Sequence, residues 1–272
     1  MKESTSVYKL GIFIPSLGRA GAVRTLTELP KSIHDQVHLV VHKSEYRKYK
    51  EIYGDVVLRT STNGIGNVRQ WIMESSAYDY VLMLDDDMSF SHRQGTKLKP
   101  AGPKQVMNMI CQLYDWLEVG FVHVGISPRF GNFQVDTPFA DVTRMNNAYA
   151  YRVKPFLSQG IRFNRLQVME DFDVTLTLLE KGYPNRVSYE YAWAQRKSGD
   201  DGGCSLYRTS RTQAEAAQGL KKLHPKYVKV VKKTSKVAWK GFESRTRTDV
   251  NIQWKKAYHP KRDKQSGISK FL

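Results

Sequence analysis

Residues 81–90, VLMLDDDMSF, run four apolar residues directly into three consecutive carboxylates, Asp85, Asp86 and Asp87. A short continuous apolar run is typical of a strand that is buried on both faces. Adjacent carboxylates repel one another, and removing one from water is costly unless a positive partner is present. Two interpretations are open: a solvated acidic turn, or a divalent-cation site at the carboxyl end of a central strand, where open α/β sheets bind their ligands.

The sequence around this stretch alternates between strand-like and helix-like segments. Short apolar runs predict strands at residues 8–17, 36–42 and 55–61. Helical spacing and turn residues predict helices at 22–33, 44–54 and 63–77. Because strands that alternate with helices form parallel sheets covered on both faces, we expect an α/β fold.

Composition narrows the class of protein. The chain has 272 residues, of which 40% are hydrophobic, which suits one large domain or one domain with an extension. It has no apolar run near the roughly 18 residues of a membrane-spanning helix. Pro15 interrupts the first apolar run, which therefore indicates a strand rather than a signal peptide. The two cysteines, Cys111 and Cys204, lack metal-ligand spacing and predict a reduced, cytoplasmic protein.

Charge divides the chain into two parts. The whole chain carries 43 basic and 26 acidic residues, a formal net charge of +17. Residues 221–272 alone hold sixteen basic and three acidic residues, so most of the excess lies in the last fifth. We expect a nearly balanced body at 1–200 and a basic segment at 201–272 that packs on it. A positive segment of this kind indicates a polyanionic partner.

A second acidic motif lies in residues 168–185, VMEDFDVTLTLLEKGYPN. Glu170 and Asp171 stand immediately before an amphipathic helix that Lys181 and Gly182 end. Acidic residues at a helix N-terminus are favoured by the helix dipole, and that alone accounts for them. A catalytic role is the alternative.

The two acidic motifs, in this order, resemble GT-A fold glycosyltransferases, which use nucleotide-sugar donors. The resemblance implies a Rossmann-type, mostly parallel sheet flanked by helices. It also implies that Asp85 and Asp87 hold Mn²⁺ or Mg²⁺, which binds the diphosphate of the donor, most simply a UDP-sugar. In inverting members a Glu-Asp pair supplies the catalytic base, which here corresponds to Asp171, with Glu170 as the fallback.

The resemblance extends to other candidate residues. The loop 14–25 would cradle the nucleotide through Pro15, Ser16, Gly18 and Arg19, although an ordinary strand-to-helix turn also explains it. The remaining donor-binding candidates are Asn63, Arg69, Asp85 and Asp86. Arg69 reaches the diphosphate or is a surface arginine.

Two histidines have contrasting expectations. Some GT-A enzymes use a late histidine as a further metal ligand, which makes His224 a candidate; a helix-terminus role is the alternative. His123 lies in an apolar run and is expected in the core.

A closer resemblance joins five segments. IPSLGRAG, NGIGNVRQWI, DDDM, MEDFD and GGCSLYRT occur in the order expected of phage TET-associated glycosyltransferases, and the similarity reaches about Lys233. That family is thought to attach sugars to oxidised pyrimidines, such as 5-hydroxymethylcytosine, in phage DNA. The resemblance implies a metal-dependent hexosyl- or pentosyltransferase that acts on modified duplex DNA in the cytoplasm of an infected host.

The basic segment supports a DNA acceptor on physical grounds, because lysine and arginine neutralise phosphates and aromatic rings stack on bases. The candidate DNA-binding residues are Arg208, Lys232, Lys233, Lys236, Lys240, Arg245 and Arg247. A solvated face that serves only solubility is the alternative for them. The aromatic residues are either stacking platforms or the core of a small β element: Trp239, Phe242, Trp254 and Tyr258.

Three other functions remain open. A glycosyltransferase acting on a cell-surface polysaccharide would use the basic segment to contact an anionic polymer. A non-catalytic DNA-binding protein would retain a transferase-like body but hydrolyse no donor. A nucleotidyltransferase also needs clustered aspartates, although the Glu-Asp helix argues against it.

Overall fold

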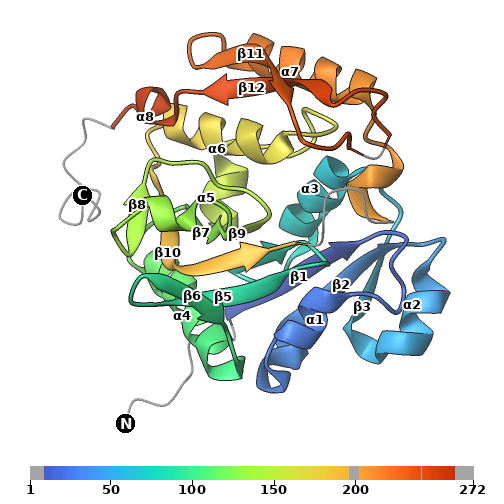
Figure 1. The fold of residues 1–272 in the computed structure, drawn as a ribbon. Coiled ribbons are helices and arrows are strands. Elements are labelled where there is room, and N and C mark those ends of the chain that lie inside the picture. The colour runs from blue at the N-terminus through green and yellow to red at the C-terminus, as the bar shows by residue number, and fades with distance from the viewer. Residues whose placement is uncertain (1–8, 196–201, 240, 261–272) are drawn as a thin grey trace.

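The computed structural model describes residues 9–195, 202–239 and 241–260 (Figure 1). In this part of the chain one large sheet has the strand order β3-β2-β1-β4-β9-β7-β10-β5-β6, with β8 paired to β10. The strands of this sheet are β1 (Leu10–Ser16), β2 (Val37–His42), β3 (Val57–Thr60), β4 (Tyr80–Leu84), β5 (Ser89–Gln94), β6 (Lys97–Pro100), β7 (His123–Pro128), β8 (Phe139–Asp141), β9 (Ala148–Arg152) and β10 (Asn185–Ala194). The α/β fold expected from the sequence is confirmed.

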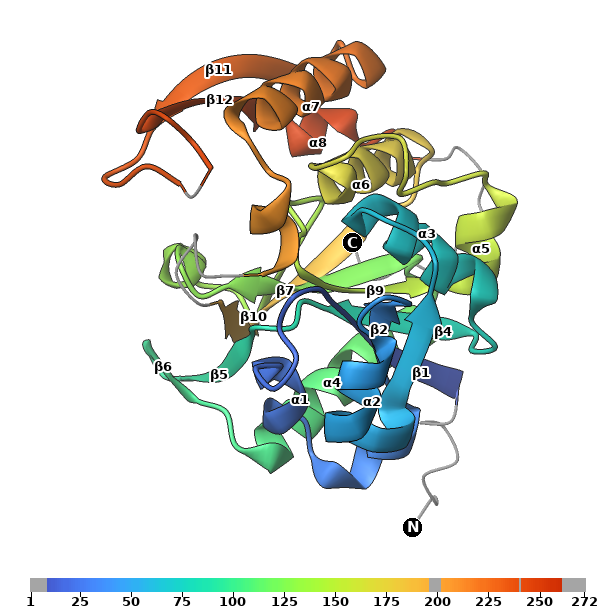
Figure 2. The ribbon, with the colours of Figure 1, turned by 90° about the vertical axis from the view of Figure 1, so that its right-hand side faces the viewer.

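Helices cover both faces of the sheet, as Figures 1 and 2 show. One face carries α1 (Arg24–Glu28), α2 (Tyr46–Tyr53) and α4 (Pro103–Glu118); the other carries α3 (Ile65–Ser75), α5 (Val153–Ser158) and α6 (Glu170–Glu180). Alternate residues of β1 supply the two cores, since Ile12 and Ile14 join one and Phe13 joins the other. Short 3₁₀ turns lie at Lys31–Gln36, Gly54–Val56, Asn132–Gln134 and Gly203–Leu206.

The topology explains where the three aspartates lie. Strands β1, β2 and β3 are parallel and progress in one direction, whereas β4 returns to the other side of β1 and is parallel to it. The side of the sheet on which successive strands are added therefore switches between β1 and β4. Open α/β sheets bind ligands at this switch point. Every residue of β4 is buried, and Asp85–Asp87 follow it. The predicted central strand is confirmed.

The C-terminal elements form a third layer on α6, as Figure 2 shows. They are α7 (Ser210–Leu223), β11 (Val228–Thr234), β12 (Thr246–Ile252) and α8 (Trp254–Ala257), and β11 pairs with β12 antiparallel. Leu176 of α6, Leu220 of α7 and Val250 of β12 share one apolar core. No helix in the described ranges is long and apolar enough to span a membrane.

The aromatic residues of this layer are packed against neighbours. Phe242 is buried and meets Trp239 edge-on, and Trp254 meets Phe172 of α6 edge-on. Tyr258 packs against the same core as Trp254. These contacts support a structural role for the aromatic residues rather than one as free stacking platforms.

His224 joins this layer to α6. Its imidazole is buried, with Nε2 2.8 Å from Asp173 Oδ1 and Nδ1 3.0 Å from Glu180 Oε1. Both ring nitrogens face carboxylates. These contacts favour a structural role for His224, and its assignment as a metal ligand stays a prediction. His123 is buried in β7, as expected, and burial lowers its pKa to about 4.

This joint predicts a pH-dependent stability. Burial alone lowers the pKa of His224, but the hydrogen bonds that its ring donates to Asp173 and Glu180 outweigh it and raise the pKa. Arg165 also faces Asp173, at 2.8 Å. A raised folded-state pKa adds stability below about pH 6.5 that is lost as pH rises through the folded pKa. We expect the free energy of unfolding, measured by urea titration, to fall as the pH rises through the folded-state pKa of His224. His224→Gln should make this free energy depend less on pH. Parallel plots of unfolding free energy against pH for the two proteins would contradict the role of His224.

Candidate active site

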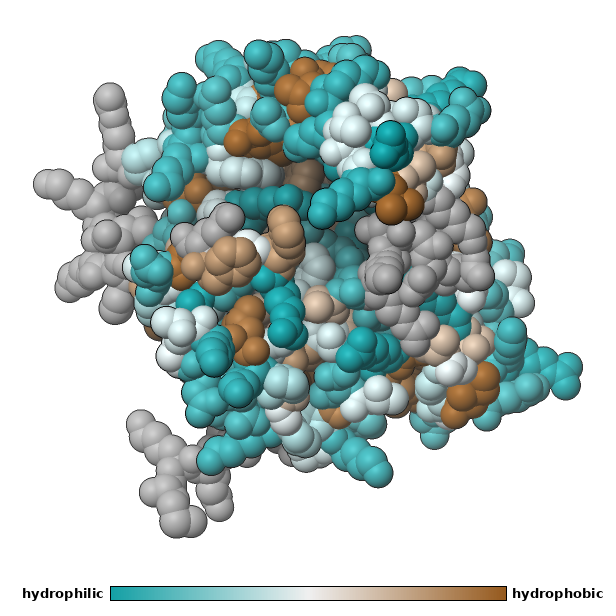
Figure 3. Space-filling model, in the orientation of Figure 1, coloured by the Kyte–Doolittle hydropathy of each residue, from teal (hydrophilic) through white to brown (hydrophobic). Residues whose placement is uncertain are grey.

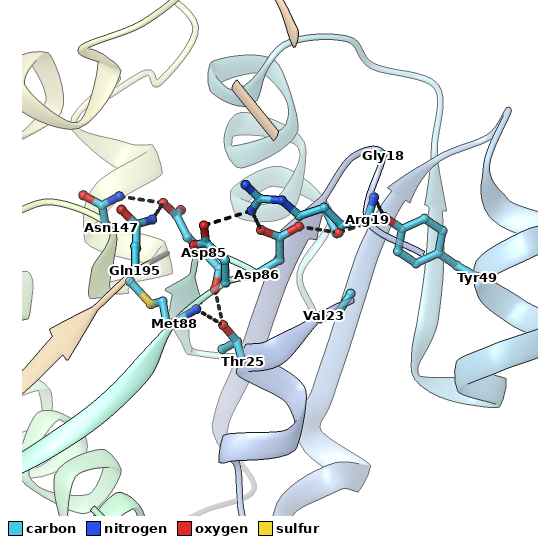
Figure 4. Close-up of polar contacts among 12 residues, drawn as sticks. Gly18, Arg19, Val23, Thr25, Tyr49, Asp85, Asp86, Met88, Asn147 and Gln195 are labelled. Carbon is cyan, nitrogen blue, oxygen red and sulfur yellow. Dashed lines mark hydrogen bonds and ion pairs between the residues drawn. The ribbon is translucent and has the colours of Figure 1, made fainter. Parts of the chain in front are cut away.

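Residues at the carboxyl end of β1 and in the loop after it contact two of the three aspartates. Arg19 pairs with Asp86 and lies with Nη1 3.2 Å from Asp87 Oδ2, and Ser16 Oγ donates to Asp86 (Figure 4). Gly18, at φ 71°, permits the turn that brings Arg19 back over the sheet. The structure thus brings together three of the predicted donor-binding residues, Ser16, Arg19 and Asp86. Asn63, another of the predicted residues, is exposed and joins none of these contacts. Pro15 lies within β1, partly buried.

These carboxylates are poorly solvated. Burial raises the pKa of Asp87 to about 6, and Arg19 opposes the rise. Burial also raises the pKa of Asp86, again against Arg19. Oδ1 of Asp87 is buried, and no described group donates a hydrogen bond to it. The site therefore has a buried carboxylate oxygen that is free to bind a positive partner.

Arg69 of α3 connects the two acidic motifs. Its side chain is only 6% exposed, Nη2 lies 2.8 Å from Asp85 Oδ1, and Nη1 pairs with Glu170 at the start of α6. The guanidinium also lies over the ring of Tyr149, 5.2 Å from its centroid. A planar fork can reach two carboxylates at once, which lysine cannot. Arg69 is thus an interior bridge and not a surface arginine.

Asp85 also accepts two amide hydrogen bonds that the sequence analysis missed. Asn147 Nδ2 lies 2.6 Å and Gln195 Nε2 2.7 Å from Asp85 Oδ2 (Figure 4). Asn147 has a left-handed backbone, with φ 65°, which asparagine tolerates better than most residues. Its neighbour in sequence is a second asparagine, Asn146, and this polar pair directly before β9 is the signal that could have indicated the site.

Glu170 and Asp171 begin α6, as the sequence predicts. The residue before them, Met169, has a left-handed backbone with φ 66°, a conformation that non-glycine residues adopt at a cost near functional sites. Burial raises the pKa of Glu170 to about 7 against the pull of Arg69. Burial also raises the pKa of Asp171, against Arg69 and Arg144. Asp171 is the more exposed of the two residues, since it is half-buried and Glu170 is buried.

The segment that begins at Gly202 packs against the loop after β1, which carries Arg19. Gly203 N donates to Leu17 O at 2.8 Å, and a Cβ placed on Gly202 would lie 2.5 Å from Arg19 Cγ. Glycine is therefore required at 202 for this close approach. Tyr207 OH accepts from Ile65 N at 3.2 Å, which ties the same segment to the start of α3.

The basic candidates fall into three groups. Arg208 lies close enough to Glu170 and Asp171 for its charge to oppose the rise in their pKa values, which places it near the start of α6. Lys233 and Arg247 pair with Asp249, at 3.6 and 3.0 Å, and Arg247 also stacks on Trp239. The exposed candidates are Lys232, Lys236 and Arg245; Lys240 lies outside the described residues.

The residues present suit a metal only in part. Among the described residues, no three His, Cys, Asp or Glu side chains lie close enough together to hold an ion. The unpaired Asp87 Oδ1 does fit an ion that binds one or two carboxylates, keeps waters and relies on substrate phosphates, as Mg²⁺ does. The site thus fits a cation that arrives with its diphosphate rather than one held in a complete cage.

Comparisons with known proteins agree with this geometry. The family model described as TET-Associated Glycosyltransferase matches residues 10–203. The chain is 23% identical over 228 residues to the Beta-glucosyl-HMC-alpha-glucosyl-transferase of Enterobacteria phage T6, covering 78% of this chain and 80% of that one. The phage T2 protein of the same name matches to the same extent.

Solved structures share the fold. Staphylococcus aureus TarS (residues 1–349) with UDP-GlcNAc superposes with a TM-score of 0.53 at 15% identity, covering 78% of this chain and 66% of that one. The mannosyltransferase PcManGT of Pyrobaculum calidifontis, with GDP-Man and Mn²⁺, gives 0.51 at 14% identity, covering 80% and 64%. The chain thus spans less than two thirds of either solved chain. The expected GT-A-like fold is confirmed.

The bridge through Arg69 generates a stability prediction. Arg69→Ala leaves Asp85 and Glu170 without their shared cation in a buried site. Removing one partner of a buried ion pair costs about 3–5 kcal/mol, and we expect a loss of this size in urea unfolding. The matched control is Arg24→Ala, which removes an exposed i,i+4 pair with Glu28 and should cost less than about 1 kcal/mol. Equal losses in the two variants would contradict the bridging role.

Proposed function

Because the chain belongs to the TET-associated glycosyltransferase family, we propose that it transfers a sugar from a nucleotide donor to a hydroxyl on a modified pyrimidine, such as 5-hydroxymethylcytosine, in phage DNA. One observation carries the proposal: Arg69 joins Asp85, at the switch point of the sheet, to Glu170, at the start of α6. The phage T6 and T2 relatives are each named Beta-glucosyl-HMC-alpha-glucosyl-transferase, and these names support an acceptor built on a modified cytosine.

The donor lies across the carboxyl ends of β1 and β4. Ser16 and Asp86, which contact each other, would hydrogen-bond the ribose, and Arg19, which pairs with Asp86, would pair with the diphosphate. Asp87 and Asp85 would hold Mn²⁺ or Mg²⁺, which when bound neutralises the leaving diphosphate. The TarS and PcManGT structures with UDP-GlcNAc and with GDP-Man and Mn²⁺ are consistent with a UDP-sugar or related donor.

The acceptor is activated at the start of α6. Asp171, the more accessible carboxylate, takes the proton of the attacking hydroxyl. Its raised pKa moves it towards the operating pH, which favours proton transfer. Glu170 stays tied to Arg69 and holds that guanidinium between donor and acceptor. Arg208 adds positive charge beside the pair.

The direct test uses a panel of acceptors and donors. The protein is incubated with DNA containing 5-hydroxymethylcytosine and UDP- or GDP-sugars, and the digested nucleosides are weighed by mass spectrometry. The expected result is a nucleoside heavier by one sugar residue, absent with unmodified DNA. Transfer to a cell-surface polysaccharide instead, or donor turnover without any DNA product, would overturn the proposed acceptor.

Metal dependence is tested on the donor side. We expect EDTA to abolish transfer and Mn²⁺ or Mg²⁺ to restore it in the wild type. Asp87→Ala removes the buried carboxylate oxygen Oδ1, which accepts no hydrogen bond, so transfer should be lost and added metal should not restore it. The mutation also relieves repulsion among the three aspartates, so the free energy of unfolding should be maintained or should rise. An Asp87→Ala protein that is fully active in EDTA would refute the metal assignment.

The base is tested by isosteric substitution. Asp171→Asn keeps the shape but removes the proton acceptor, so the transfer rate should fall by roughly 10²-fold or more. Donor binding, measured by calorimetry with the nucleoside diphosphate, should be preserved. Glu170→Gln is the comparison, because it weakens the Arg69 bridge. Near wild-type rates in both variants would exclude general-base catalysis by this pair.

DNA binding by the C-terminal layer is tested with exposed residues only, since Lys233 is paired with Asp249. Charge reversal of Lys232, Lys236 and Arg245 should raise the KM for DNA and lower the salt slope of binding by about 3. Reversal of Lys31, Lys104 and Lys154, which are exposed on other elements, is the control for net charge. If the two triple variants bind DNA with the same affinity and salt slope, Lys232, Lys236 and Arg245 serve only solubility.

A further inference from the structure

A pocket opens beside the active site between the β5–β6 hairpin and the loop that follows β7. It has a volume of about 750 Å³, and its walls include Lys97, Lys99, Arg129, Phe130 and Phe133. Ala194, the last residue of β10, also lines it, and the next residue, Gln195, donates to Asp85. One wall of the pocket thus lies next in sequence to a residue that contacts the carboxylate cluster.

The pocket presents positive charge to solvent. Lys97, Lys99 and Arg129 are exposed, and Lys97 and Lys99 lie on the same side of β6 because alternate strand residues share a face. Of the described residues that line the pocket, none is acidic. Such a surface favours a polyanion.

Two phenylalanines stand almost free in water. Phe130 is 93% exposed and Phe133 is 65% exposed, although burying such a side chain would gain roughly 1.5–3 kcal/mol. The face that carries β5 and β6 in Figure 1 is otherwise largely hydrophilic, with separate apolar patches (Figure 3). Isolated exposed rings beside cations are typical of surfaces on which bases stack.

The loop that carries these rings is firmly anchored. Asn132, between them, is 1% exposed; its Nδ2 donates to Ser127 Oγ at 2.6 Å and to Tyr189 O at 3.1 Å. Arg93 of β5 in turn donates to Asn132 O at 2.9 Å. The buried side chain of Asn132 thus fixes the loop with both rings pointing outward. Because the loop is already ordered, binding a strand to the rings costs little conformational entropy.

We propose that this pocket binds an unpaired segment of the acceptor DNA, with Phe130 and Phe133 stacking on bases and Lys97, Lys99 and Arg129 contacting phosphates. Only an unpaired base exposes the face that a ring can cover, and chemistry on a base within a duplex commonly requires the nucleotide to leave the stack. The inference rests on the proposed function for the identity of the strand as acceptor. It adds an unpaired-strand site on the body of the protein to the basic C-terminal layer. In Figure 2 the β5–β6 and β11–β12 hairpins extend towards the same side.

The test measures binding alone, so that it does not depend on sugar transfer. Unmodified, fluorescein-labelled 20-nucleotide DNA is titrated by anisotropy as a single strand and as a duplex. Phe130→Ala/Phe133→Ala should weaken single-strand binding by about tenfold or more, since stacking is lost from two bases, and should change duplex binding less. Lys97→Glu/Lys99→Glu should weaken both and lower the salt slope by about 2.

Matched controls separate the pocket from general effects. Val119→Ala removes an exposed apolar side chain on the far end of α4, and Lys31→Glu/Lys154→Glu makes the same charge change elsewhere. A strand containing 2-aminopurine gives a second readout, because stacking on a ring quenches its fluorescence; the wild type should quench it and the phenylalanine variant should not.

The outcomes are distinct. Single-strand affinity within about twofold of wild type in the phenylalanine variant, or an equal loss in the controls, overturns the inference. An equal loss for the duplex and the single strand, with no 2-aminopurine quenching by wild type, also overturns it. Loss of single-strand binding in that variant, together with a wild type that glycosylates no DNA, would leave the pocket as a DNA site and would refute the proposed function instead.

Discussion

One buried guanidinium holds the active site together. Arg69 lies between Asp85 at the end of β4 and Glu170 at the start of α6, and Tyr149 covers its face. A buried charge without partners costs several kcal/mol, so neither carboxylate can move far without leaving Arg69 or its partner unpaired. The rest of the site depends on this constraint, because it fixes the distance between the proposed donor side, at the end of β4, and the proposed acceptor side, at the start of α6.

The fold supplies the two ends of that bridge independently. The switch between β1 and β4 opens the edge of the sheet where Arg19 meets Asp86 and Asp87. The α6 helix is fixed from behind by the third layer, through the apolar core and the His224 contacts. The C-terminal elements therefore have a structural task besides any contact with DNA, since they hold the helix that carries the proposed base.

Patterns within short stretches of sequence predicted the individual strands and helices of this arrangement. The apolar run before Asp85 and the helical spacing after Asp171 each reflect burial of neighbouring residues, and both elements form where expected. Contacts between distant residues leave no such pattern. Asn147 and Gln195 reach Asp85 from 62 and 110 residues away. The contacts of His224 with Asp173 and Glu180 were missed for the same reason, because nothing near it in the sequence reveals them.

A double-mutant cycle on sugar transfer tests the bridge most directly. The kcat/KM for DNA containing 5-hydroxymethylcytosine is measured for wild type, Asp85→Asn, Glu170→Gln and the double variant. If Arg69 couples the donor and acceptor sides, the second substitution should cost much less once the first is made, with a coupling of about tenfold, or 1.4 kcal/mol. Additive losses would mean that Asp85 and Glu170 act separately, and would contradict the account.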